Sequence, residues 1–276
     1  MAELWIALVV ASAFVHAFWN ALLQKYGDNK RAATTGYLIN FSVVLFLLVP
    51  LFLTRGSISL SQDALYYVAL GGVLDVLVVW LLVKGLTSDY TSTYALRNAS
   101  VLFQLLFGVT LLGEQVAMLA VGGIVMIAVG GILFYNISRF TLYGLALAVV
   151  SAVSAVVAKP GVMLTNPFFY QASVNLISGV VLMSFTFISA RRIVAPQLDH
   201  VRGLLAMGFF VTLASSLWLF AVSLERVSYV GPASSVRIVF ALLLAYFLLR
   251  ERKDFGRKTI ASLLVLAGVV AITLRA

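Results

Sequence analysis

The sequence contains no cysteine, which excludes disulfide bonds and thiolate metal sites. Charged residues are also scarce: they form 11% of the 276 residues, whereas a soluble domain has about 25%. Because 62% of the residues are hydrophobic, we expect an all-α integral membrane protein. Only one histidine and one aspartate fall well inside the apolar segments, so we expect no metal site, no cofactor and no enzymatic activity.

Ten apolar segments are long enough to cross a bilayer as helices, since about 20 apolar residues span the hydrocarbon core. They cover residues 3–24, 35–54, 64–86, 90–112, 115–135, 141–159, 167–189, 201–223, 228–249 and 256–274. The connections between them are short, which predicts an antiparallel bundle embedded in the lipid bilayer.

The net charge of +9 does not indicate a nucleic-acid partner, because most basic residues lie in short connections between spans, where they set topology. One side holds Lys25, Lys30, Arg31, Lys84, Arg139, Arg191, Arg192, Arg202, Arg250, Arg252, Lys253, Arg257 and Lys258. The other side holds only Arg55, Lys159, Arg226 and Arg275. The rule that basic loops stay inside predicts a plasma or inner membrane protein whose two termini are extracytoplasmic.

The second half of the chain repeats the first. Residues 87–114 and 223–251 each run from a polar turn through Tyr, Ser and Thr into an apolar stretch, with Arg97 in the first copy and Arg237 in the second. The closing glutamates are 137 positions apart, from 114 to 251. This predicts two five-helix repeats, residues 1–137 and 138–276. Because five is odd, the second repeat enters the membrane inverted, an arrangement typical of secondary transporters.

Three features carry a resemblance to a known family. LLGEQ at Leu111–Gln115 is followed by GGIVMIAVGG at Gly122–Gly131, LLRER at Leu248–Arg252 is followed by Gly268, and Trp19-Asn20 ends the first span. Together with the length, the span count and the repeat, they resemble the ten-helix EamA-type members of the drug/metabolite transporter superfamily. The resemblance implies a carrier that moves small organic solutes, often exporting amino acids or related metabolites. It also implies a cavity lined mainly by helices one, three, four, six, eight and nine. We interpret the paired glycines of 122–131 as sites of close helix packing.

Arg97 lies on a polar stripe of the fourth span with Thr93, Ser100 and Gln104, and with Tyr94 alongside. An arginine is costly inside a membrane, so this stripe must face other helices or water. The functional interpretation is that Arg97 binds an anionic group of the solute. The alternative is that it reaches the interface or pairs with Asp75.

Arg237 follows Gly231, Pro232 and Ser234 in the ninth span. Either the Gly-Pro pair breaks the span, as at transporter sites, or it opens a helix with proline in the first turn. Arg237 and Ser234 are substrate-site candidates in both cases.

Two further groups are candidates for coupling. His16 has an unperturbed pKa near 6.5, which suits proton coupling, although a lone membrane histidine is more often a packing residue. Asp75 either relays protons, binds a cation or neutralises an arginine. Two arginines against one aspartate leave the interior positive, which favours a carboxylate- or phosphonate-bearing solute. Further lining candidates are Trp19, Asn20, Trp80 and Trp218.

We therefore expect a secondary transporter that exports an amino acid or other carboxylate-bearing metabolite by alternating access, with protons or a counter-solute as the coupling species. It would act as a monomer or homodimer. The alternatives are an exporter of cationic drugs or amines that uses Asp75, and a passive channel.

Overall fold

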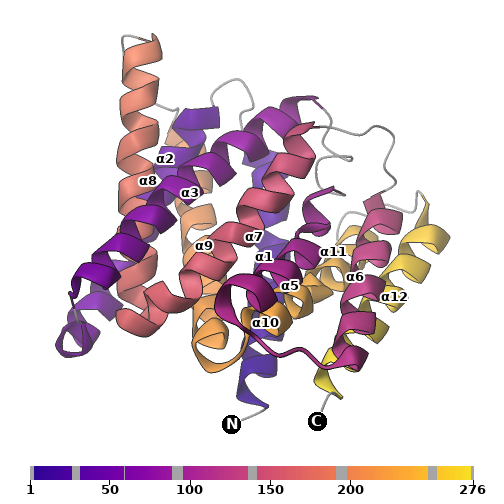
Figure 1. Cartoon of the computed structure of the whole chain (residues 1–276). Helices are drawn as coiled ribbons and strands as arrows, with labels where there is room; N and C mark the ends of the chain where they lie inside the picture. Colours follow the sequence, from indigo (N-terminus) through magenta and orange to yellow (C-terminus); the bar gives the residue numbers. More distant parts are fainter. Residues whose placement is uncertain are drawn as a thin grey trace.

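The computed structural model describes residues 3–26, 32–58, 60–88, 96–135, 142–190, 198–247 and 254–274, and every regular element within these ranges is a helix (Figure 1). The α-helices are α1 (Leu4–Tyr26), α2 (Ala32–Thr54), α3 (Gln62–Ser88), α5 (Ser100–Leu112), α6 (Met118–Tyr135), α7 (Leu142–Leu164), α8 (Pro167–Ala190), α9 (Leu198–Leu224), α10 (Val227–Ala233), α11 (Arg237–Phe247) and α12 (Phe255–Thr273). Two 3₁₀ turns, η2 (Arg55–Ser57) and η3 (Ser234–Val236), complete them.

Within the described residues, eight helical stretches are long and apolar enough to cross a membrane. Two shorter apolar stretches, Leu4–Trp19 and Leu96–Leu112, lie where the first and fourth spans were expected. The protein is therefore an all-α, multi-pass membrane protein, as the sequence predicted. α7 runs through Pro160 to Leu164, five residues beyond the predicted end of the sixth span.

Helix contacts come in matching pairs. The contact of α1 with α9 in one direction matches that of α7 with α3 in the other, because α7 and α9 occupy the places of α1 and α3 in the second half. In the same way, α2 with α9 matches α8 with α3, and the fourth span with α7 matches α11 with α1. The remaining major contacts, α2 with α8, α5 with α10 and α6 with α12, join helices that occupy corresponding places in the two halves. If every helix is replaced by the helix in the corresponding place of the other half, the same set of major contacts is obtained.

α6 and α12 form a layer of their own at one end of the bundle (Figure 1) and cross at glycines. A Cβ at Gly123 would lie 2.5 Å from the Gly268 carbonyl oxygen, and one at Gly130 would lie 2.8 Å from that of Ala261. These two positions confirm close packing, because only glycine lets the backbones approach so far. The interpretation is wrong for Gly122, beside which nothing lies within 4 Å.

Two side chains tie helix ends together on the face where α1 begins and α12 ends. Glu114 accepts hydrogen bonds from the first turn of α10: 2.8 Å from Val227 N, and 2.9 and 2.6 Å from Ser228 N and Oγ. Gly113 ends α5 with a φ of +65°, a conformation that favours glycine, and so turns Glu114 toward α10. Lys159 of α7 donates to the Val222 carbonyl in the last turn of α9 and to the Glu225 carbonyl just beyond it, at 2.5 and 2.9 Å.

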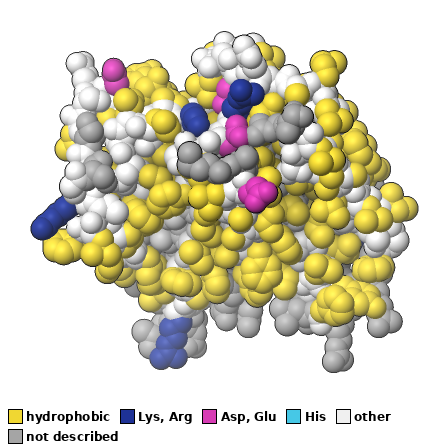
Figure 2. Space-filling view, turned by 90° about the horizontal axis from the view of Figure 1, so that it is seen from below, with side chains coloured by type: hydrophobic (Ala, Val, Ile, Leu, Met, Phe, Trp, Pro, Cys, Tyr) yellow, Lys and Arg dark blue, Asp and Glu magenta, His cyan; other side chains and the backbone are white. Residues whose placement is uncertain are grey.

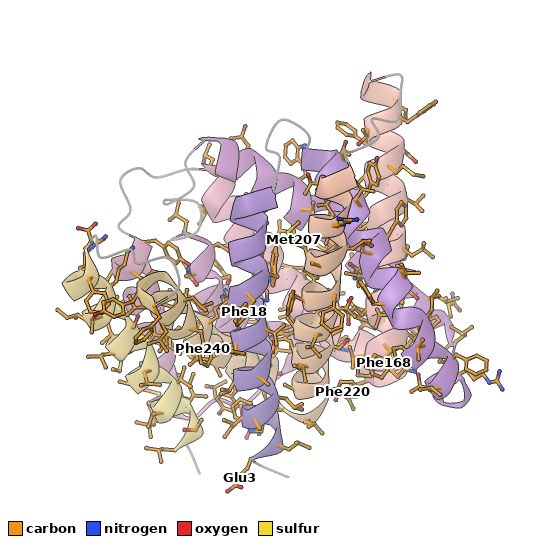
Figure 3. The ribbon with its side chains drawn as sticks, turned by 180° about the vertical axis from the view of Figure 1, so that it is seen from behind. Glu3, Phe18, Phe168, Met207, Phe220 and Phe240 are labelled. Carbon is orange, nitrogen blue, oxygen red and sulfur yellow. The ribbon has the colours of Figure 1, made fainter. Side chains whose placement is uncertain are left out.

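Figure 2 shows this face from below, with acidic and basic side chains gathered in one area and hydrophobic side chains spread over much of the rest. Aromatic rings pack on the outer side of the bundle. Phe14 contacts Phe18 and Phe240 at centroid distances of 5.1 and 5.3 Å, which joins α1 to α11, and Phe168 meets Phe220 at 5.1 Å (Figure 3).

Candidate functional site

A cavity of about 270 Å³ lies between α1, α3, the fourth span, α7, α8, α9 and the α10–α11 segment. These are the predicted lining helices with α8 added. The polar residues that line it are Ser12, His16, Asp75, Arg97, Ser100, Gln104, Ser151, Ser154, Tyr170, Gln171, Asn175, Ser215, Ser234 and Arg237. The cavity therefore joins both halves of the chain and is large enough for a solute of amino-acid size.

Both arginines line this cavity, and each stands beside a turn within its span. Arg97 lies in a helical turn at 96–98 that is separated from α5 by a turn at Ala99. Arg237 is the first residue of α11, directly after η3. Both side chains are partly buried. The alternative that Arg97 pairs with Asp75 stays a prediction.

The ninth span passes Gly231 and Pro232 without ending. The helix begins at Val227, so Pro232 stands beyond its first turn and has no N–H to bond to the preceding turn. The chain passes into η3, where Ser234 Oγ donates to the Gly231 carbonyl at 2.6 Å. The side chain of Gln104 occupies the space beside Gly231. The backbone stays helical through Ala233, Ser234 and Arg237, so the span continues past Pro232 through one tightened turn beside the cavity and is not opened by proline in its first turn.

Three buried polar atoms of cavity residues have no hydrogen-bond partner among the described residues: His16 Nε2, Gln104 Oε1 and Ser151 Oγ. A buried polar atom without a partner is unfavourable by about 1–3 kcal/mol.

Asp75 faces the cavity from α3, and its described hydrogen-bond partners lie behind it. It accepts hydrogen bonds from Asn40 of α2, with an Nδ2–Oδ2 distance of 3.4 Å, and from the Ser178 hydroxyl of α8. Asn40 Nδ2 also donates to Ser178 Oγ at 2.9 Å. Asn40 and Ser178 are buried and do not line the cavity.

Of the other predicted site residues, Trp218 and Ser234 line the cavity, whereas Trp19 and Trp80 do not. Trp19 packs edge-on against His16 at 5.0 Å, and Trp80 is 40% exposed on the outside of the bundle. Tyr94 and the side chain of Asn20 lie outside the described residues.

Sequence reasoning missed four polar lining residues: Ser151 and Ser154 on α7, and Tyr170 and Gln171 on α8. Gln171 is 2% exposed and is held by α9, since Ser216 Oγ donates to its Oε1 at 2.7 Å and its Nε2 donates to the Thr212 carbonyl at 3.3 Å. For Ser151 and Ser154 the sequence does contain a usable pattern, because two serines three residues apart lie on the same side of a helix.

Comparisons with known proteins agree with this architecture. The model of the EamA-like transporter family matches residues 139–274, about half the chain. A crystal structure of another protein aligns with 98% of this chain and 96% of its own length, at a TM-score of 0.79 and 17% sequence identity, which shows a shared fold. No curated protein sequence matches the chain significantly.

Proposed function

The chain belongs to the EamA-like transporter superfamily and is a membrane transporter of small solutes, and on that premise we propose that its solute carries a carboxylate or a similar anionic group. One observation carries the proposal: Arg97 and Arg237, from the two halves of the chain, line one cavity in the bundle. Guanidinium groups bind carboxylates through paired hydrogen bonds and keep their charge when buried.

The turns within the fourth and ninth spans support the same assignment. The N-terminal ends of α5 and α11 begin at the cavity, at Ser100 and Arg237. The Arg237 N–H already donates to the Ser234 and Ser235 carbonyls, so the groups that these turns offer to an anion are side chains, those of Ser100, Ser234 and Arg237. Asp75 is the opposing negative charge in the cavity wall, and its carboxylate hydrogen-bonds to Asn40 and Ser178. An anionic solute therefore meets a cavity of complementary charge.

The transport cycle that we propose is alternating access by two inverted repeats, residues 1–137 and 138–276, with export as its direction. The paired helix contacts support the division, because exchanging the halves preserves them. The cavity lies between the halves, where a rocking movement would open it to one side and then the other. The direction of export rests on the family alone.

An exporter of amines is the second candidate, because the Asp75 carboxylate lines the cavity and could receive a cation. Such a solute would approach Asp75 in a cavity that also presents two arginines, which disfavours a cation. A passive channel is distinguished by transport itself: a carrier shows saturable counterflow of labelled solute, and a channel does not.

The test is thermal unfolding of the purified protein with a panel of neutral amino acids, dicarboxylates, phosphonates and lipophilic cations. A solute that binds only the folded state stabilises it by about 2.7 kcal/mol at a hundredfold excess over its dissociation constant. We expect anionic or zwitterionic members to stabilise the protein, and Arg97→Gln and Arg237→Gln to lose the effect. Arg55→Gln is the matched control, because Arg55 is exposed and lies over the Phe52 ring, away from the cavity. Stabilisation by lipophilic cations alone would overturn the proposal.

A further inference from the structure

The Asp75 cluster has no role in binding an anionic solute, yet it is the one place in the cavity wall where a carboxylate is built in with dedicated partners. Its three members come from three helices: Asp75 from α3, Asn40 from α2 and Ser178 from α8. Under the proposed division, α2 and α3 belong to the first half and α8 to the second. The cluster therefore joins the two halves directly, and one side of it opens into the solute cavity.

The charge of Asp75 sets the strength of this junction. An ionised carboxylate accepts hydrogen bonds from both Asn40 and Ser178, and charge-assisted bonds are roughly twice as strong as neutral ones. A protonated carboxyl has lost one charge and become a donor, so it holds the same two donors less firmly.

We propose that Asp75, held by Asn40 and Ser178, is the proton-binding site of the transporter and that its protonation loosens the contact between the two halves. The step is a simple proton transfer: the Asp75 carboxylate takes a proton from water on one side of the membrane and returns it to water on the other side after the halves have moved. This inference rests on the proposed carrier function and names the ion that drives it.

The groups that face Asp75 are compatible with this role. α8 presents Tyr170, and around the same cavity lie His16 of α1, Arg97 of the fourth span and Arg237 of α11. Among the described residues, α7 and α9 contribute only serine and apolar or aromatic side chains that do not titrate to the cavity wall, and α2 presents Asn40. His16 is the competing proton acceptor. It packs against Trp19 and makes no hydrogen bond through Nε2 within the described residues.

The absence of cysteine makes the test direct, because a single introduced thiol has no background. Ser154→Cys places a thiol on the cavity wall of α7, and its alkylation rate by a membrane-impermeant reagent reports access to the cavity. The rate is measured in vesicles between about pH 4 and 8, a range that runs from the ordinary pKa of an aspartate, about 3.9, to above that of an imidazole, about 6.5. It is divided by the rate for Gly56→Cys, which is exposed with nothing within 4 Å and corrects for the chemistry of the thiol.

We expect the corrected rate to change several-fold with pH, and Asp75→Asn to fix it at the value seen at low pH, since asparagine mimics the protonated carboxyl. Asp75→Glu restores the pH dependence, and Asn40→Ala and Ser178→Ala move its midpoint. His16→Gln leaves the pH dependence intact. The inference is overturned if Asp75→Asn keeps the pH dependence, if His16→Gln removes it, or if access responds to sodium at constant pH instead.

This outcome is separable from that of the proposed function. Stabilisation by anionic solutes together with pH-independent access would refute the proton site and keep the anion carrier. Asp75-dependent access without stabilisation by any anionic solute would do the reverse.

Discussion

At the scale of single residues, Glu114 is a structural carboxylate whose three bonds all go to the first turn of α10. Glu114→Ala leaves two N–H groups and a hydroxyl without their partner, at a cost of about 1–3 kcal/mol. We expect the thermal midpoint of the purified protein to fall accordingly, with a smaller fall for Glu114→Gln, which keeps one acceptor oxygen. Gln115→Ala is the matched control, because only the main chain of Gln115 is tied down. Equal midpoints for Glu114→Ala and Gln115→Ala would contradict this role.

Lys159 shows why a lysine near a span end need not be a topology signal. Its ammonium group caps the C-terminal end of α9, where the helix dipole also favours a cation. Lys159→Met removes both interactions, so we expect a loss of about 1–3 kcal/mol in the free energy of unfolding. Denaturant or thermal unfolding measures it, with Arg202→Gln, an exposed cation at the other membrane face, as the comparison. An unchanged Lys159→Met variant would assign the lysine to topology after all.

At the scale of helices, the crossing of α6 and α12 makes neighbouring glycines respond in opposite ways. Gly123→Ala places a methyl group against the Gly268 carbonyl, a backbone atom that cannot move aside without separating the helices. Gly122→Ala meets nothing within 4 Å and gains helix propensity worth about 0.5–1 kcal/mol. We expect thermal unfolding to show destabilisation for the first and no loss, or a slight gain, for the second. A similar response of both variants would show that the helices do not cross there.

Much of this architecture was predictable from the sequence, for identifiable reasons. The spans are long and almost purely apolar, and Arg97 and Arg237 stand out because a charge in such a run requires a polar environment. What could not be predicted is which side of each helix faces inward. Gly122 and Gly123 are equivalent in the sequence, and Trp80 and Trp218 share a position in their repeats, yet only Trp218 reaches the cavity. Tyr170 and Gln171 lie near the start of a span, where polar and aromatic residues are expected at the interface and attract no attention.

At the scale of the whole molecule, the orientation in the membrane stays a prediction from the charge bias, and two exposed glycines test it. Gly56 follows α2 on the face where α1 begins, and Gly256 lies in the first turn of α12 on the opposite face (Figure 1). Neither has a neighbour within 4 Å of an added Cβ, so cysteine is accepted at both positions without strain. In intact cells we expect an impermeant thiol reagent to label Gly56→Cys and to spare Gly256→Cys. The opposite pattern would invert the protein and place both termini in the cytoplasm.

Under the proposed alternating access, the hydrogen bonds of Glu114 and Tyr229 would set how the molecule divides its time between conformations. Under alternating access, opening toward the face where the chain begins and ends separates the α5–α6 connection from α10, which breaks the three bonds of Glu114 and the 3.1 Å bond from Ala117 N to Tyr229 Oη. Four bonds of about 0.5–1.5 kcal/mol each amount to about 2–6 kcal/mol. At rest, about one molecule in thirty or fewer is then open on that face. A solute shifts this population only if it binds the open state more tightly than the closed state. The free energy that breaks these hydrogen bonds must therefore come from binding of the solute or of the coupling ion.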